Sequence, residues 1–188
     1  METAIPTKSE LGSMNDTGRS RHNQCVLVDW GDTVMRVLPE LPGPMEKWPI
    51  VEVVPGAVEA IEQLRRDAFV CLATNAADSD ERAIGAALAR VGLDTHFDRI
   101  FCFENVGCRK PTEAYYQTVL DTLGLSPDRV FMIGDDFDVD VVGATAVGIR
   151  SVWLNLLSGE ERSGSLYTTA NSFVMVLEAL EELGFVGS

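Results

Sequence analysis

Short apolar runs alternate with helix-like segments along most of the chain, and this alternation constrains the fold more than any other feature. Five runs predict strands, at Cys25–Val28, Phe69–Ala73, 99–103, 130–133 and 151–154. Segments with apolar residues at helical spacing lie between and after these runs, at 57–67, 78–91, 111–123, 138–147 and 171–183. Strands that alternate with helices indicate a parallel sheet covered by helices on both faces.

The length and the local composition predict one folded domain behind a tail. A chain of 188 residues is the size of a single domain. Residues 1–24 are polar and show no periodicity, so we predict a disordered tail there and one domain over 25–188. Within the tail, Gly12-Ser13-Met14 resembles a cloning scar, so part of the tail is interpreted as vector-derived. Residues 38–55 hold five of the eight prolines, which predicts a stiff loop or lid.

Charge and cysteine usage exclude several classes of partner. Fifteen Lys and Arg against twenty-nine Asp and Glu give a net charge of −14, so nucleic acid and membrane surfaces are not expected partners. The four cysteines form no C-x-x-C pair, and three of them lie in apolar runs, which favours free thiols in a reducing compartment. The chain has no apolar run of about 20 residues and no signal-like start, so we expect a cytoplasmic protein.

Polar residues follow three of the predicted strands at the point where each strand ends. Asp29 follows the first, Thr74-Asn75 follows the second, and Gly134-Asp135-Asp136 follows the fourth. Ligands of parallel α/β sheets bind beyond the carboxyl ends of the strands, so these side chains are expected at one site. Lys110 lies between the second and fourth groups, beside Pro111 at a predicted helix start. Carboxylates that bind a metal, with a lysine beside them, can hold a phosphoryl group.

The order of these residues resembles the haloacid dehalogenase-like (HAD) hydrolase superfamily. The resemblance covers residues 25–155, and the run that begins Gly134-Asp135-Asp136 and reaches Asp140 is similar to the family's fourth motif. It implies a Rossmann-like three-layer sandwich with a five-stranded parallel sheet in the order 5-4-1-2-3. It also implies hydrolysis through a covalent intermediate on an aspartate, with Mg²⁺ as cofactor.

The resemblance assigns a role to each matching residue. Asp29 matches the nucleophile, which attacks phosphorus and forms an aspartyl-phosphate. Thr74 matches the hydroxyl that binds the transferred group, Asn75 follows it as a further substrate-binding residue, and Lys110 matches the lysine that neutralises charge. The metal ligands implied by the resemblance are Asp29, Asp135, Asp136, Asp140 and the carbonyl oxygen of Gly31, with Asp136 and Asp140 also open to a supporting role around Lys110 or the metal.

The first motif departs from the pattern of the family's phosphatases. Those enzymes read Asp-x-Asp-Gly-Thr, whereas this chain reads Asp29-Trp30-Gly31-Asp32-Thr33. A glycine therefore stands where the second aspartate acts as general acid and base, a role worth about 10²–10⁴ in rate. Asp32 is the candidate replacement, although neighbouring side chains near a strand end point in opposite directions.

The gaps between the motifs leave no room for a separate cap domain, so the resemblance is to a capless or minimal-cap member. The site is expected to be open unless the loop at 38–50 or a second subunit covers it. We predict a Mg²⁺-dependent phosphatase acting on a phosphorylated small molecule or a phosphoprotein. A dehalogenase-like hydrolase and a degenerate fold that only binds a ligand or protein remain as alternatives. The oligomeric state is not indicated by the sequence.

Overall fold

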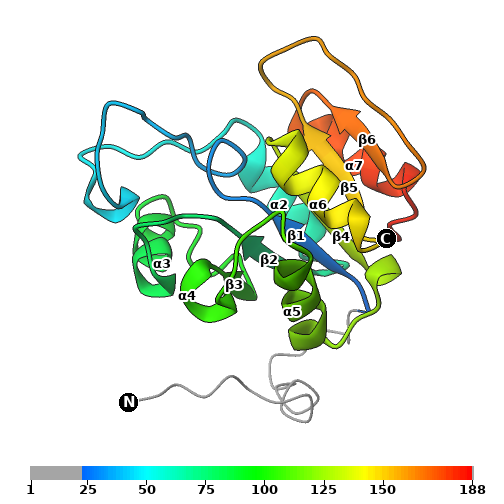
Figure 1. Ribbon diagram of the computed structural model, residues 1–188. Helices are drawn as coiled ribbons and strands as arrows, with labels where there is room; N and C mark the ends of the chain where they lie inside the picture. Colours follow the sequence, from blue (N-terminus) through cyan, green and yellow to red (C-terminus); the bar gives the residue numbers. More distant parts are fainter. Residues whose placement is uncertain (1–22, 188) are drawn as a thin grey trace.

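Six parallel strands form the centre of the molecule in the computed structural model, which describes residues 23–187 (Figure 1). Their order across the sheet is β3-β2-β1-β4-β5-β6, and each neighbouring pair is parallel. This arrangement is the Rossmann-like α/β sandwich that the sequence predicts. The strands are β1 (Cys25–Val28), β2 (Phe69–Ala73), β3 (Arg99–Phe101), β4 (Val130–Gly134), β5 (Arg150–Leu154) and β6 (Tyr167–Ala170).

The prediction of a five-stranded sheet is wrong, because β6 adds a sixth strand at the edge beside β5. The five expected strands have the neighbours that the order 5-4-1-2-3 describes. The sequence Tyr-Thr-Thr-Ala of β6 contains no apolar run, and only Ala170 is buried. This strand forms because it pairs with β5, where Ser151 lies opposite Tyr167, and not because its own sequence has an apolar pattern.

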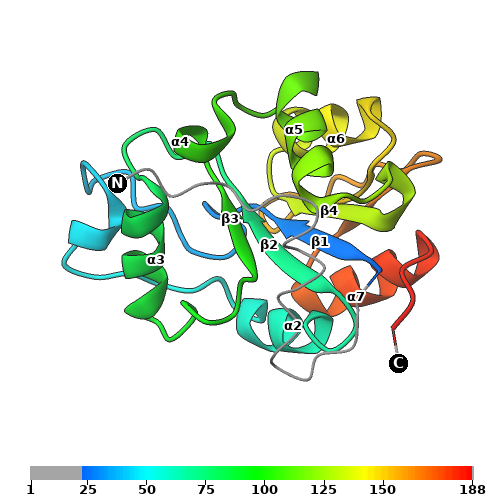
Figure 2. The ribbon, with the colours of Figure 1, turned by 90° about the horizontal axis from the view of Figure 1, so that it is seen from below.

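Helices cover both faces of the sheet (Figure 2). Figure 2 shows α2 and α7 on one side of the strands and α5 and α6 on the other. The predicted helix at 111–123 begins later than expected, because the Thr112 side chain accepts a hydrogen bond from the Tyr115 N–H and caps the helix. The helices are α2 (Ala57–Leu64), α3 (Glu81–Ala89), α4 (Phe103–Val106), α5 (Glu113–Leu123), α6 (Gly143–Ala146) and α7 (Phe173–Glu182), with short turns η1 (Met45–Lys47), η2 (Pro127–Arg129) and η3 (Phe137–Val142).

Alternate residues of each strand face opposite layers of the core. Val26 and Val28 of β1 pack with α2, α3 and α7, whereas Cys25 and Leu27 pack with α5 and α6. All four side chains of β1 are fully buried. Because both faces of a central parallel strand are covered, its sequence is continuously apolar rather than alternating.

The predicted helix at 138–147 is divided into two elements. Residues Phe137–Val142 form the π-helical segment η3, and α6 begins at Gly143. The Tyr116 hydroxyl donates to the carbonyl oxygens of Val139 and Asp140, at 3.1 Å each, so these two carbonyls of the π-helical segment have a hydrogen-bond partner. A π-helical segment of this kind often marks a functional site.

The proline-rich segment 38–55 is a structured excursion whose C-terminal part pairs with residues 34–36, just before it. Arg36 N–H donates to the Glu52 carbonyl at 2.9 Å, and Val54 N–H donates to the Val34 carbonyl at 2.9 Å. The turn η1 lies inside the excursion, and Trp48 is buried beside it. A lid function for this segment stays a prediction.

The predicted tail extends too far at its C-terminal end. Residues 1–22 lie outside the described part of the chain, together with the Gly12-Ser13-Met14 interpretation. Gln24, however, is 4% exposed, and its side-chain amide exchanges two hydrogen bonds with the backbone of Val186. Gln24 therefore belongs to the folded domain, because a buried amide needs such partners.

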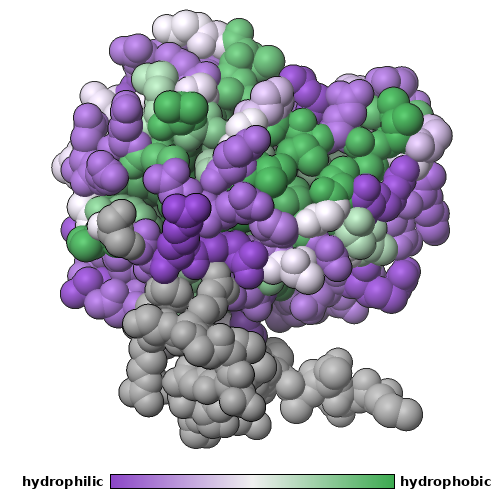
Figure 3. Space-filling model, turned by 180° about the vertical axis from the view of Figure 1, so that it is seen from behind, coloured by the Kyte–Doolittle hydropathy of each residue, from purple (hydrophilic) through white to green (hydrophobic). Residues whose placement is uncertain are grey.

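Apolar side chains also reach the surface. Figure 3 shows them gathered among polar ones on the face opposite the view of Figure 1. Val174 of α7 and Val186 near the C-terminus are exposed. No helix among residues 23–187 is long and apolar enough to span a bilayer.

Candidate active site

The carboxyl ends of β1 and β2 bring Asp29 and Thr74 to the same edge of the sheet, as predicted. The Asp29 N–H donates to the Ile133 carbonyl at 2.9 Å, so its backbone continues the pairing of β1 with β4. The Thr74 N–H donates to the Phe101 carbonyl at 2.9 Å, and the Thr74 hydroxyl accepts from the Ala76 N–H at 3.1 Å. Both side chains are largely buried, which fixes their positions.

Lys110 connects two carboxylates at the centre of the site. Its Nζ lies 2.6 Å from Oδ1 of Asp29 and 2.6 Å from Oδ1 of Asp140. Lys110 is 3% exposed, so these charge-assisted hydrogen bonds are made out of contact with bulk water. The arrangement places the lysine where it neutralises the negative charge of the Asp29 carboxylate.

Asn75 holds Lys110 in place through the backbone. Its side-chain amide donates to the Lys110 carbonyl at 2.8 Å, and its Oδ1 accepts from the Lys110 N–H at 3.0 Å. Both hydrogen-bonding groups of the Asn75 amide therefore have partners within the protein. Asn75 acts on Lys110 in this structure, and a contact with substrate stays a prediction.

Asp135 lies close to Asp29 and Asp140, and its position is fixed by Thr33, a residue for which the sequence predicts no role. The Thr33 hydroxyl donates to Oδ1 of Asp135 at 3.2 Å and accepts from the Asp135 N–H at 3.1 Å. Trp153 donates its indole N–H to the Asp135 carbonyl at 2.8 Å. Thr33 is fully buried in the first motif, and this reciprocal pair joins that motif to the end of β4.

Asp140 has both carboxylate oxygens engaged by the protein. Oδ1 pairs with Lys110, and Oδ2 accepts from the Asp136 N–H at 3.2 Å. Gly134 is required beside it, because a Cβ at this position would lie 2.1 Å from Oδ2 of Asp140. This geometry fits Asp140 as a positioning group for Lys110 better than as a free metal ligand.

Asp136 and Asp32 lie outside the cluster that Asp29, Asp135 and Asp140 form. Oδ1 of Asp136 accepts from the N–H groups of Asp138 and Val139, at 3.0 Å each, so this carboxylate caps η3. Asp32 is exposed, has φ +52°, and accepts from the Val37 N–H at 3.0 Å. Each carboxylate is engaged by the local backbone.

Gly31 lies on the tight turn between Asp29 and Asp32. A Cβ at this position would lie 3.0 Å from Cγ2 of Val37, which is closer than side chains normally approach. The absence of a side chain therefore lets the segment after position 36 pack against the turn. Its carbonyl oxygen as a metal ligand stays a prediction.

The charges of the cluster are not balanced. Burial alone would lower the pKa of Lys110, but the carboxylates of Asp29 and Asp140 outweigh it and hold this pKa well above its usual range. Burial raises the pKa of Asp135 to about 6, and the Asp29 charge adds to the effect. Burial also raises the pKa of Asp140 to about 7 against the attraction of Lys110. Three carboxylates share one ammonium, so an added cation would relieve their repulsion.

The donor set fits a hard divalent cation. Asp29, Asp135 and Asp140 each offer an oxygen, and these atoms lie within 4.8 Å of one another. Carboxylate oxygens are the ligands that Mg²⁺ prefers, and it commonly binds through one or two of them. Asp29 and Asp135 fit that role, because both oxygens of Asp140 are engaged. A bound Mg²⁺ would supply positive charge for an anionic substrate in a protein of net charge −14.

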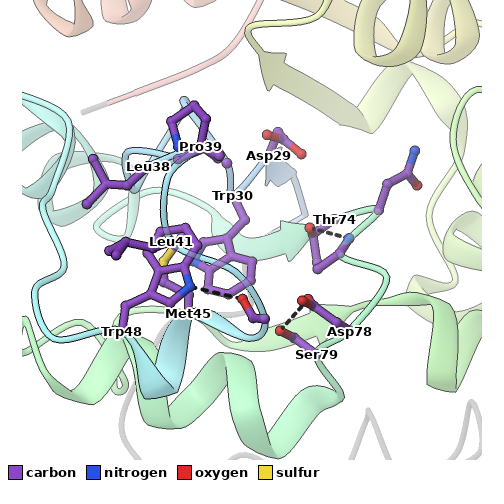
Figure 4. Close-up of a pocket in the computed structure, with 15 residues that line it drawn as sticks. Asp29, Trp30, Leu38, Pro39, Leu41, Met45, Trp48, Thr74, Asp78 and Ser79 are labelled. Atoms are coloured by element: carbon purple, nitrogen blue, oxygen red, sulfur yellow. Dashed lines mark hydrogen bonds between the residues drawn. The ribbon is translucent and has the colours of Figure 1, made fainter.

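A pocket of about 480 Å³ extends from Asp29 and Thr74 toward the proline-rich segment (Figure 4). Figure 4 shows Leu38 and Leu41 on one side of it and Thr74 and Asp78 on the other. The excursion that was predicted as a lid therefore supplies one wall of a pocket that begins at the candidate nucleophile. Two tryptophans, Trp30 and Trp48, also line the pocket. The sequence alone does not show which residues form the apolar wall of this pocket.

The protein is thus an α/β protein with a buried lysine between two carboxylates at the carboxyl ends of its parallel strands, an arrangement typical of an enzyme active site. The chain matches the family model of haloacid dehalogenase-like hydrolases over residues 20–148, and it belongs to that family. It is 32% identical over 129 residues to the pyrimidine 5'-nucleotidase YjjG of Escherichia coli (strain K12), a match that covers 68% of this chain and 56% of the relative.

The chain is also similar to a second curated protein and to a solved structure. The chain is 30% identical over 103 residues to the ribulose-1,5-bisphosphate 5-phosphatase of Halopiger xanaduensis, covering 54% of this chain and 42% of that protein. An uncharacterized protein from Listeria monocytogenes serotype 4b has the same fold, with a TM-score of 0.76 and 24% identity over 87% of this chain and 99% of that one. The chain spans about half the length of the curated relatives that it matches.

Proposed function

We propose that this protein is a Mg²⁺-dependent phosphatase that works through an aspartyl-phosphate on Asp29. The observation that carries the proposal is the ammonium of Lys110, which lies 2.6 Å from the carboxylates of both Asp29 and Asp140 in a buried site. The two curated relatives are a nucleotidase and a phosphatase, which supports a phosphate ester as the substrate.

The proposed reaction has two steps. A carboxylate oxygen of Asp29 attacks phosphorus, the phosphorus–oxygen bond to the leaving group breaks, and the leaving oxygen takes up a proton. Water then attacks phosphorus of the aspartyl-phosphate, which releases inorganic phosphate and a proton and restores the Asp29 carboxylate. Lys110 stabilises the charge on the phosphoryl oxygens, and the hydroxyl of Thr74 binds the transferred group.

The first step lacks a positioned acid that could donate a proton to the leaving group. Gly31 offers no side chain for this task, and the exposed Asp32 carboxylate is engaged by the Val37 N–H. We therefore propose that leaving groups that are stable as anions react best. 4-Nitrophenyl phosphate is expected to be turned over much faster than alkyl phosphates.

Three isosteric variants test the proposal with 4-nitrophenyl phosphate in the presence of Mg²⁺. Wild type should release phosphate and form a covalent phosphoryl adduct that mass spectrometry can detect, and Asp29→Asn should abolish both. Asp136→Asn is the matched control, since asparagine also caps helices and the carboxylate lies outside the cluster. Asp32→Asn should change the rate little, and a loss as large as that of Asp29→Asn would make Asp32 the acid and base.

Restoring the missing carboxylate provides a further test. Gly31→Asp should raise turnover of alkyl phosphates by up to about 10²-fold if the new carboxylate reaches the leaving group. The new Cβ would meet Val37 at 3.0 Å, so the double variant Gly31→Asp/Val37→Ala separates steric crowding from chemistry.

Gly31 also favours a second candidate, hydrolysis of a carbon–halogen bond by the same nucleophile. Such a reaction needs no acid, because halide leaves as an anion. Halide release from 2-chloropropionate, with no phosphate release from any ester, would favour this candidate. Tight binding of phosphate analogues without turnover of either substrate would favour a binding protein.

A further inference from the structure

The pocket beside Asp29 has two walls of different chemistry. The first wall comes from the excursion after β1 and contains Leu38, Leu41 and Trp48, with Trp30 next to them (Figure 4). The second wall comes from the segment after β2 and contains Asp78 and Ser79, whose side chains lie 3.3 Å apart. An occupant would therefore meet an apolar surface on one side and oxygen atoms on the other.

Arg90 holds the apolar wall in a fixed position. Its Nη1 donates to the Trp48 carbonyl at 2.6 Å and to the Met45 carbonyl at 3.3 Å, and its Nη2 donates to the Pro49 carbonyl at 3.2 Å. Trp48 is fixed from its other end, because its indole N–H donates to the Gly43 carbonyl at 2.9 Å. The wall is therefore preformed, which reduces the entropy lost when a ligand binds.

The charge of the pocket restricts what it can accept. Asp29 and Asp78 are carboxylates that line it, and none of the described residues lining it is Lys or Arg. Lys110, the cation of the site, is buried beneath Asp29 and already shared by two carboxylates. A second anionic group on the substrate would find no cation in this pocket.

We infer that the pocket binds the leaving group of a phosphate monoester, and that this part of the bound ester carries an apolar ring and no ionised group. The inference rests on the proposed function, since the phosphoryl group must lie at Asp29 for its leaving group to lie in the pocket. The apolar wall packs against one face of the ring, and Asp78 accepts a hydrogen bond from a donor on the other side. A volume of about 480 Å³ is in the range typical of small-molecule sites, which favours a metabolite-sized ester over a phosphoprotein.

The experiment compares three esters with Mg²⁺: ethyl phosphate, 2-phenylethyl phosphate and 2-carboxyethyl phosphate. Their leaving groups are primary alcohols of similar acidity, so differences in kcat/KM report on the pocket rather than on the chemistry. Burial of the ring should favour 2-phenylethyl phosphate over ethyl phosphate by about 10- to 100-fold. The carboxylate should make 2-carboxyethyl phosphate the poorest of the three.

Two variants of the excursion provide the matched comparison. Leu41→Ala removes apolar surface from the wall and should reduce the ratio of kcat/KM for 2-phenylethyl phosphate to kcat/KM for ethyl phosphate severalfold. Ile50→Ala removes an exposed side chain of the same excursion that does not line the pocket, and should leave the preference unchanged. An equal loss of preference in both variants would overturn the assignment of the wall.

The outcomes separate the pocket from the proposed function. Equal kcat/KM for 2-phenylethyl phosphate and ethyl phosphate, with turnover that depends on Asp29, would refute the proposed role of the pocket but not the proposed phosphatase activity. No turnover of these three esters or of 4-nitrophenyl phosphate would refute the phosphatase. Calorimetry with 2-phenylethylphosphonate and ethylphosphonate, which are not hydrolysed, then decides the pocket: tighter binding of the first supports it, and equal affinities refute it.

Discussion

Replacement of Lys110 by methionine should destabilise the metal-free protein strongly. The ammonium is 3% exposed and lies 2.6 Å from two carboxylates, of which Asp140 is also buried. Methionine keeps most of the side-chain volume but leaves Asp29 and Asp140 without their cation. Removal of one partner of a buried ion pair costs about 3–5 kcal/mol of unfolding free energy, so we expect a loss of that size at pH 7.

Urea unfolding followed by circular dichroism in the presence of a chelator measures this loss. The control is Lys47→Met, the same substitution at an exposed lysine, which should change the unfolding free energy by less than about 0.5 kcal/mol. The double variant Lys110→Met/Asp140→Asn should be more stable than Lys110→Met, because it removes one of the two unpaired charges. A loss below about 1 kcal/mol for Lys110→Met would equal that of a surface ion pair and refute the reasoning.

The pH dependence provides an independent check. Carboxyl groups whose pKa is raised in the folded state destabilise it as pH rises above their unfolded pKa. Loss of Lys110 removes an attraction that lowers the pKa of Asp140, so this pKa should rise above about 7 in the variant. The deficit of Lys110→Met should therefore shrink at pH 5 and grow toward pH 8. A deficit that does not change with pH would show that lost packing, not charge, causes it.

Three further predictions concern neighbouring features. Gly134→Ala should displace Asp140 and lower kcat by about 10²-fold, whereas Gly85→Ala, where a Cβ meets nothing within 4 Å, should leave kcat unchanged; steady-state kinetics compare the two. Arg90→Ala should release the apolar wall and reduce the preference for 2-phenylethyl phosphate, with ethyl phosphate turnover unaffected; competition assays measure the ratio. In the metal-free wild type, Asp135 has its pKa raised to about 6 by burial and by the charge of Asp29, so the unfolding free energy should fall as pH rises from 4 to 6, and urea titrations at both values test it.

The arrangement of the sheet could be predicted where the sequence carries a strong apolar run. The run Cys25–Val28 is buried on both faces and matches β1 to the residue. The strand β6 could not be predicted, because its threonines are half-buried and its position depends on the free edge of β5. The segment at 138–147 reads as one helix, but contacts from Tyr116 and the cap at Asp136 divide it in ways that no local pattern encodes.

The sequence predicts that the strand-end residues of the candidate site lie together, but not which groups they contact. Asp32 and Asp136, which the sequence analysis also assigned to the site, lie outside the carboxylate cluster. The strand ends place Asp29, Thr74 and Asp135 together, because parallel strands finish at one edge. The sequence cannot show which oxygen is already engaged by the backbone. Asp136 caps a helical segment and Asp32 binds the Val37 N–H, and both outcomes follow from short polar side chains bonding to nearby N–H groups.

The altered first motif and the pocket favour the same kind of ester. In the proposed reaction, glycine at position 31 leaves the leaving group without a positioned acid, so the stability of the leaving group as an anion would control the first step. The glycine also leaves the turn open to close approach by Val37, which lines the pocket with Leu38 and Leu41. An oxygen attached directly to an aromatic ring is a good leaving group and places that ring next to phosphorus, where the apolar wall lies. Aryl phosphates therefore satisfy both constraints at once, whereas an alkyl ester with a distant ring satisfies only the second.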